Sequence, residues 1–155
     1  MAIRNVVKEG DSVLRKHARP VTEFNERLHI LLDDMAETMY ATNGVGLASN
    51  QVGILRRVVV IDVGEGLIEL VNPEIIDKKG TQQEVEGCLS CPGEYGITKR
   101  PMWVKVKAQD RNGNVCYYEG EELLARAFCH EIDHLDGILY KDVVIRMLSP
   151  DEIET

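Results

Sequence analysis

Residues 129–137, Cys-His-Glu-Ile-Asp-His-Leu-Asp-Gly, hold the densest group of chemically active side chains in this sequence. On an α-helix, positions four apart lie one turn above each other, so His130 and His134 can bind one metal ion. Glu131 would lie beside that ion and could take a proton from a water bound there, as in hydrolytic metalloenzymes with the His-Glu-x-x-His pattern. The spacing predicts a metal-dependent hydrolase, provided that other residues complete the site.

The third metal ligand does not follow from this helix alone. A catalytic metal usually has three protein ligands and one open position. The extended zinc-protease pattern would place a histidine at position 140, where this chain has Tyr140. A later glutamate could come only from Glu152 or Glu154, in an acidic tail that begins at about 149. Cys88, in a glycine-flanked segment upstream, is the remaining candidate, and a Cys-His-His set leaves one position for water.

A closed structural zinc site is the alternative, with Cys88 and Cys91 joining His130 and His134. The 38 residues between Cys91 and His130 exceed the spacing of a zinc finger, which is about 12 to 15. A closed site also leaves Glu131 without a role. A structural-zinc interaction domain and a metallopeptidase that cuts ordinary peptide bonds stay open as alternative functions.

The elements that must position these residues are short and mixed. Apolar residues recur at helical spacing over about 23–42, and a second helix is expected over about 121–135. Short connections between the strands favour antiparallel pairing. The prediction is an α+β fold with mostly antiparallel sheets packed around the C-terminal motif helix. The expected strands cover 57–63, 67–72, 74–77, 102–109 and 115–119, with a hairpin turn over 110–114. The glycine-rich residues 87–93 are expected to interrupt the strand pattern.

Composition limits the class of protein. A chain of 155 residues with 44% hydrophobic content predicts one domain, residues 1–155, ending in the short acidic tail. The net charge of −8 argues against nucleic-acid binding. No apolar run reaches the ~20 residues of a membrane span, and no signal sequence follows Met1, so we expect a cytoplasmic protein with reduced cysteines and no membrane contact.

Three separated segments together resemble the peptide deformylase family. Residues 44–51 match its Gly-x-Gly-Leu-Ala-x-x-Gln motif, residues 86–90 match Glu-Gly-Cys-Leu-Ser, and residues 130–134 match His-Glu-x-x-His, in the family's order. Alone, residues 44–51 would be interpreted as a helix-to-strand turn. The resemblance implies that the protein removes the formyl group from the N-terminal formyl-methionine of newly made polypeptides, a step of protein biosynthesis.

The resemblance also implies roles for individual residues. Cys88, His130 and His134 would hold ferrous iron (Fe2+), with Zn2+, Ni2+ or Co2+ able to replace it. Glu131 would carry the proton from water to the departing amine. The side-chain amide of Gln51 and the backbone N–H of Leu89 would stabilise the negative oxygen that forms.

The substrate is expected to be an extended N-formyl-methionyl peptide that pairs with backbone, a mode that depends little on its sequence. Apolar residues near His130 would hold the methionine side chain, although plain core packing explains several of them equally well. Asp133 is expected either to orient a ligand histidine or to face solvent. The expected substrate-binding residues are Val45, Gly46, Glu86, Gly87, Leu123 and Ala127.

Three features depart from the family pattern. Ser49 replaces an alanine that is common in the family, and Cys129 replaces a glutamine directly before His130. Some family members contact the ribosome through a longer basic C-terminal helix, whereas the tail here is short and acidic. Any transient ribosome association is therefore expected to use another surface.

Overall fold

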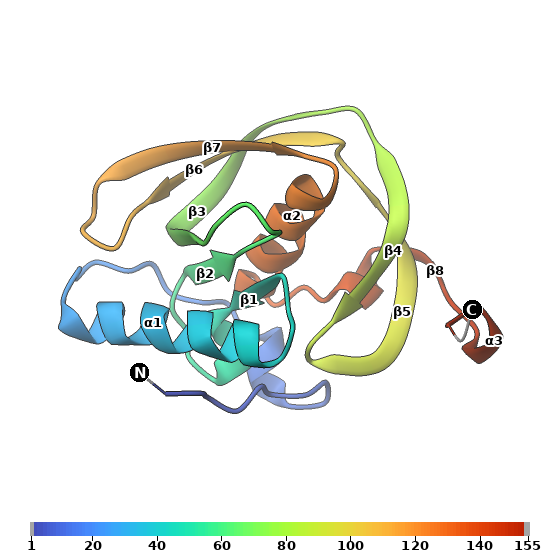
Figure 1. Cartoon of the computed structure of the whole chain (residues 1–155), viewed down its shortest axis with the longest axis horizontal. Helices are drawn as coiled ribbons and strands as arrows, with labels where there is room; N and C mark the ends of the chain where they lie inside the picture. Colours follow the sequence, from blue (N-terminus) through green and yellow to red (C-terminus); the bar gives the residue numbers. More distant parts are fainter. Residues whose placement is uncertain (1, 154–155) are drawn as a thin grey trace.

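The computed structural model describes residues 2–153 and contains two longer helices and two antiparallel sheets (Figure 1). The helices are α1 (Glu26–Ala41), α2 (Leu123–Leu135) and α3 (Pro150–Ile153), with short 3₁₀ turns at Ser12–Arg15, Ser49–Val52 and Tyr140–Asp142. The strands are β1 (Gly46–Ala48), β2 (Val58–Ile61), β3 (Ile68–Lys79), β4 (Gln82–Cys88), β5 (Cys91–Arg100), β6 (Trp103–Gln109), β7 (Val115–Glu121) and β8 (Val144–Met147).

The two sheets flank α2. One sheet has the order β1-β2-β3-β6-β7, the other has the order β4-β5-β8, and all their strand pairs are antiparallel. Helix α2 packs against the larger sheet and also contacts β5 of the smaller one (Figure 1). The predicted α+β fold with antiparallel sheets around the motif helix is therefore confirmed.

Strand β2 shows how the core holds the two helices in place. Because side chains alternate along a strand, Val58 and Val60 pack in the cluster that α1 covers, whereas Val59 and Ile61 pack in the cluster that α2 covers. Helix α1 is somewhat shorter than predicted, because the side chain of Asn25 caps its first turn by accepting a hydrogen bond from the Leu28 amide. The larger sheet is thus buried on both faces where it borders the motif helix.

Several element boundaries differ from the prediction. Strand β3 continues through residue 73 by means of an irregular register, where two separate strands were expected. Strand β7 extends to Glu121, and α2 starts only at Leu123, after Glu122 turns the chain with a φ of 56°. Gly120 pairs with Val104 in this strand. A glycine is needed there because a Cβ would lie 2.6 Å from Leu124 Cγ.

The β4–β5 hairpin and β8 were not predicted at all. Residues 87–93, at the tip of the hairpin, are rich in glycine and were interpreted as a break in the strand pattern. The acidic tail forms only the short helix α3, and residues 154 and 155 lie outside the described part. Within residues 2–153, no helix is both long and apolar enough to span a bilayer.

Candidate active site

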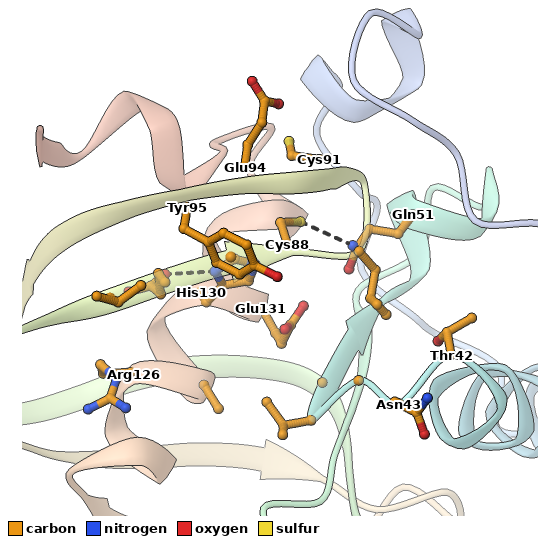
Figure 2. Close-up of a pocket in the computed structure, with 18 of the residues that line it drawn as sticks. Thr42, Asn43, Gln51, Cys88, Cys91, Glu94, Tyr95, Arg126, His130 and Glu131 are labelled. Carbon is orange, nitrogen blue, oxygen red and sulfur yellow. Dashed lines mark hydrogen bonds and ion pairs between the residues drawn. The ribbon is translucent and has the colours of Figure 1, made fainter. Parts of the chain in front are cut away.

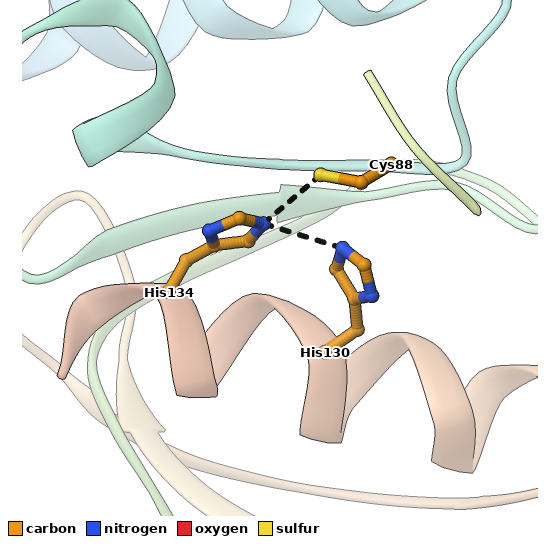
Figure 3. Close-up of side chains that lie close together, drawn as sticks. All are labelled: Cys88, His130 and His134. Atoms are coloured by element: carbon orange, nitrogen blue, oxygen red, sulfur yellow. Dashed lines mark hydrogen bonds between the residues drawn. The ribbon is translucent and has the colours of Figure 1, made fainter. Parts of the chain in front are cut away.

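Helix α2 and the end of β4 bring three potential metal ligands together (Figure 3). Nε2 of His134 lies 3.2 Å from Nε2 of His130 and 3.4 Å from Sγ of Cys88. The three ligand atoms all lie within 4.8 Å of one another. Two imidazole nitrogens and a sulfur form a donor set that suits zinc or another divalent transition metal.

Electrostatics favour neutral His134 in this cluster. Burial is the largest cause that lowers the pKa of His134 well below its ordinary value. A neutral imidazole keeps a lone pair for a metal. The Nε2 atoms of the two histidines face each other at 3.2 Å. If both present lone pairs, these repel each other, and a cation bound to both removes the repulsion. The residues therefore fit a bound metal ion.

Cys91 does not complete a closed four-ligand site. It lies opposite Cys88 in the register of the β4–β5 hairpin, but its sulfur does not join the Cys88–His130–His134 cluster. Among the described residues, it groups instead with carboxylates of Glu9 and Glu94. Cys88 therefore supplies the only thiol of the cluster within this part of the chain, which leaves room for a non-protein ligand.

A buried ion-pair network holds His130 from the side away from the cluster. Nδ1 of His130 lies 2.7 Å from Oε1 of Glu86, and Arg100 donates to both oxygens of Glu86 at 2.9 and 3.1 Å. Thr98 also donates to Glu86. Burial opposes ionisation of Glu86, but the hydrogen bonds from His130 and Arg100 outweigh it and hold its pKa far below the usual range. An ionised Glu86 keeps the proton of His130 on Nδ1, so that Nε2 faces the cluster as an acceptor.

Asp133 pairs with Arg100 and does not orient a ligand histidine directly. Its carboxylate accepts a hydrogen bond of 2.7 Å from Arg100 and, among the described residues, forms no hydrogen bond or ion pair with either histidine ring. It therefore supports His130 only through Arg100 and Glu86. Arg100 itself was not predicted, because nothing in its local sequence indicates that it pairs across the hairpin.

Glu131 points into the cavity beside the cluster (Figure 2). It is 5% exposed, and its Oε1 has no hydrogen-bond partner among the described residues. Burial raises the pKa of Glu131 to about 7. Gly46 of β1 makes room for this carboxylate, since a Cβ at Gly46 would lie 2.5 Å from Oε2 of Glu131.

Gln51 presents its amide N–H groups to the cluster. Its Oε1 accepts a hydrogen bond of 3.0 Å from the Ala48 amide, while Nε2 donates to Ser90 Oγ at 3.2 Å and to Cys88 Sγ at 3.5 Å (Figure 2). The bond from Ala48 fixes which end of the amide faces the cavity. The buried 3₁₀ turn over residues 49–52 thus holds Gln51 as a donor.

A cavity of about 360 Å³ opens onto these groups. Val45 and Leu123 are 43% and 40% exposed, so they line the cavity rather than fill the core, whereas Ala127 is buried and borders both. The predicted site residues that line it are Val45, Gly46, Gln51, Glu86, Gly87, Cys88, Leu89, Leu123, Ala127, His130 and Glu131. His134 lies beneath them and is fully buried.

Other lining residues were missed in the sequence. Tyr95 comes from β5 and stands over Gly87, where a Cβ would lie 2.7 Å from its ring. Arg126 lies between Leu123 and Ala127 on α2, and the helical spacing of those two could have indicated it. Tyr95 gave no such signal, because the hairpin that carries it was not predicted.

Comparison with known proteins decides the family. The profile of the family described as polypeptide deformylase matches residues 3–149. The chain belongs to the polypeptide deformylase family. It is 63% identical over 154 residues to the peptide deformylase of Caldanaerobacter subterraneus subsp. tengcongensis, covering 99% of this chain and 97% of that protein. The fold matches the crystal structure of peptide deformylase from Thermotoga maritima with a TM-score of 0.91 and 43% identity, covering 93% and 99% of the two chains.

The similarity extends to further deformylases. The one from Acetivibrio thermocellus is 59% identical over 154 residues, which cover 99% of this chain and 91% of that protein. The activity expected from the three motifs is thereby confirmed: this deformylase is a metal-dependent hydrolase that removes formyl groups from newly made formylated polypeptides.

Proposed function

We propose that Cys88, His130 and His134 hold the metal ion of this deformylase, with ferrous iron as the ion and zinc, nickel or cobalt able to replace it. The main support for this proposal is that the three ligand atoms lie within 4.8 Å of one another beside an open cavity. A divalent ion in this cluster would lower the pKa of water and polarise the formyl oxygen. The mixed nitrogen and sulfur donors are compatible with each of these metals.

Glu131 is the proton carrier in this proposal. Its carboxylate takes the proton of the attacking water and then gives it to the amine nitrogen that leaves the formyl carbon. A pKa of about 7 suits both halves of this transfer near neutral pH. The space that Gly46 leaves open lets the carboxylate remain in the cavity without a fixed hydrogen-bond partner on Oε1.

Gln51 and Leu89 stabilise the oxygen that becomes negative during attack. The Nε2 group of Gln51 already faces Cys88 and the cavity, held by its bond from Ala48. Leu89 lies in the two-residue turn between β4 and β5, and its backbone N–H is the second proposed donor. Neutral donors in a buried site stabilise developing charge without competing for the proton.

The substrate peptide binds as an added strand between two sheet edges. Both β1 and β4 are edge strands, and both border the cavity, at Gly46 and at Gly87. Unpaired backbone groups on such edges can pair with an extended peptide. The methionine side chain then lies against Val45, Leu123 and Ala127, with Glu86 at the base of the pocket.

The setting of the reaction belongs to the same proposal. Residues 1–155 act as one catalytic domain in the cytoplasm, on chains that are still being made. Any ribosome contact is transient and does not involve a basic C-terminal helix, since α3 carries Asp151 and Glu152 in its first turn. Neither nucleic acid nor membrane is a partner.

The proposal is tested with two peptides on protein purified anaerobically with its metal. Formate should be released from formyl-Met-Ala, while the unformylated Met-Ala-Ser should stay intact. Cleavage of the second peptide at a comparable rate would favour a general metallopeptidase. If neither peptide reacts and the metal cannot be exchanged, a structural zinc site would be favoured instead.

A further inference from the structure

The turn that carries the proposed metal ligand Cys88 also carries a second thiol. Cys88 and Cys91 are direct partners in the register of β4 and β5, separated only by Leu89 and Ser90. Directly opposed residues of antiparallel strands have Cα atoms about 4.5 to 5.5 Å apart. This range lies inside the roughly 4.4 to 6.8 Å found across disulfides. The register therefore allows a bond between the two sulfurs without unfolding the hairpin.

Access and surroundings favour this pair over the other cysteines. Both Cys88 and Cys91 border the cavity of about 360 Å³ (Figure 2). Cys88 is half-buried, so a small oxidant can reach it from the cavity, whereas Cys91 is buried and needs only to face Cys88. All four cysteines of the chain are free. Cys129 is buried in the core on α2, and Cys116 lies on β7 opposite Ala108. Neither of these two lines the cavity.

We propose that Cys88 and Cys91 form a reversible disulfide when the metal-free protein meets a peroxide, with Cys91 as the resolving thiol. The sulfur of Cys88 attacks the peroxide, an S–O bond forms, the O–O bond breaks, and one water leaves. The sulfur of Cys91 then attacks that of Cys88, the S–S bond forms, the S–O bond breaks, and the hydroxide leaves as water with the Cys91 proton. Two thiols and one hydrogen peroxide give one disulfide and two waters.

The disulfide would protect Cys88 from irreversible oxidation, but it would also prevent Cys88 from binding the metal. With Cys88 in a disulfide, only His130 and His134 remain of the proposed ligands, so metal cannot be bound tightly. A disulfide is restored by thiols, whereas sulfinic and sulfonic acids are essentially irreversible. Cys91 thus keeps an oxidised site recoverable. The role of this bond in metal binding rests on the proposed function of Cys88, but formation of the bond itself does not.

The experiment uses the full chain, stripped of metal and fully reduced, and treated with stoichiometric hydrogen peroxide. Trypsin cuts after Lys79 and Lys99, so one peptide, residues 80–99, contains both cysteines. Its mass should fall by two hydrogens, and a dithiol reductant should restore the mass and the binding of one Zn2+ per chain. The matched control Cys116→Ser also removes one thiol and should behave like the wild type.

Cys91→Ser should instead gain two or three oxygens at Cys88 and should not recover zinc binding after reduction. Cys91→Val provides a second variant in case a buried serine disturbs the hairpin. The proposal is overturned if wild-type Cys88 gains oxygens as Cys91→Ser does, or if the disulfide joins another pair. Because these readouts use mass and zinc, failure to release formate would refute the proposed function separately.

Discussion

Nδ1 of His130 lies 2.7 Å from Oε1 of Glu86, and both side chains are buried. Glu86 therefore sets the tautomer of a proposed ligand, while Arg100 balances its charge from the neighbouring strand. The sequence analysis placed Glu86 only in the methionine pocket, which it also lines. Its contacts give it a second role, as the residue that positions His130.

Glu86→Gln should lower the affinity for zinc about tenfold, because groups that orient ligand histidines typically contribute 10- to 100-fold in affinity. The loss follows from replacing a charged acceptor of the His130 proton with a neutral one. Affinity is measured by competition with a chelator at pH 7. The control is Glu84→Gln, an exposed glutamate on the same strand. Equal affinities in both variants would mean that Glu86 does not position His130.

Stability should depend on pH through the same carboxylate. The pKa of Glu86 is lower in the folded protein than its ordinary value of 4.5. Its ionised carboxylate therefore makes its full contribution to the free energy of unfolding above pH 4.5. As the pH falls below 4.5, the unfolded chain takes up the proton first, and the contribution shrinks by at most ~1.4 kcal/mol per pH unit. Urea unfolding of metal-free protein at pH 6 and at pH 3.5 measures this. The stability advantage over Glu86→Gln should narrow at the lower pH, and a constant advantage would contradict it.

Gly46→Ala should reduce formate release about 100-fold, the loss expected when a catalytic group moves by roughly 1 Å. The added Cβ would lie 2.5 Å from Oε2 of Glu131, so the carboxylate must move. Bound metal, measured by elemental analysis, should stay at the wild-type level because the three atoms nearest to the added Cβ all belong to Glu131, which is not a proposed ligand. Full activity in Gly46→Ala would show that Glu131 does not need its present position.

The sequence predicted the part of the site that depends on local spacing. His130, Glu131 and His134 lie on one helix, so their relation follows from the helical repeat. Cys88 and Gln51 come from two other segments, and their assignment needed the family motifs. The structure adds that the ligand atoms of Cys88 and the two histidines lie close together.

The rest of the site depends on pairing between distant segments, which local patterns do not encode. The glycines near Cys88 were interpreted as a break, although Gly87 lies in β4 and Gly96 lies in β5. Cβ atoms at these two positions would meet Tyr95 and Val144, respectively. Because the hairpin was not predicted, the ion pair between Arg100 and Glu86 could not be predicted either. The predicted start of α2 was too early for a similar reason. Gly120 lies in a strand, and packing against Leu124 requires a glycine there.

Cys91→Ala and Cys88→Ala distinguish the open site from the closed one. Cys91→Ala should retain about one metal ion per chain, because its sulfur lies outside the cluster. Cys88→Ala should lose most of its bound metal after dialysis against a weak chelator. Elemental analysis of both variants, each checked for folding by circular dichroism, gives the answer. Loss of metal from both would indicate a four-ligand site.

The most direct measurement is formate release from formyl-Met-Ala by metal-loaded wild type and Glu131→Gln, with metal content determined on the same samples. Because positioned proton transfer typically contributes 10²- to 10⁴-fold, Glu131→Gln should retain its metal and lose at least about 100-fold in rate. Wild-type activity in a metal-replete Glu131→Gln sample would contradict the proposed role of Glu131 as the proton carrier.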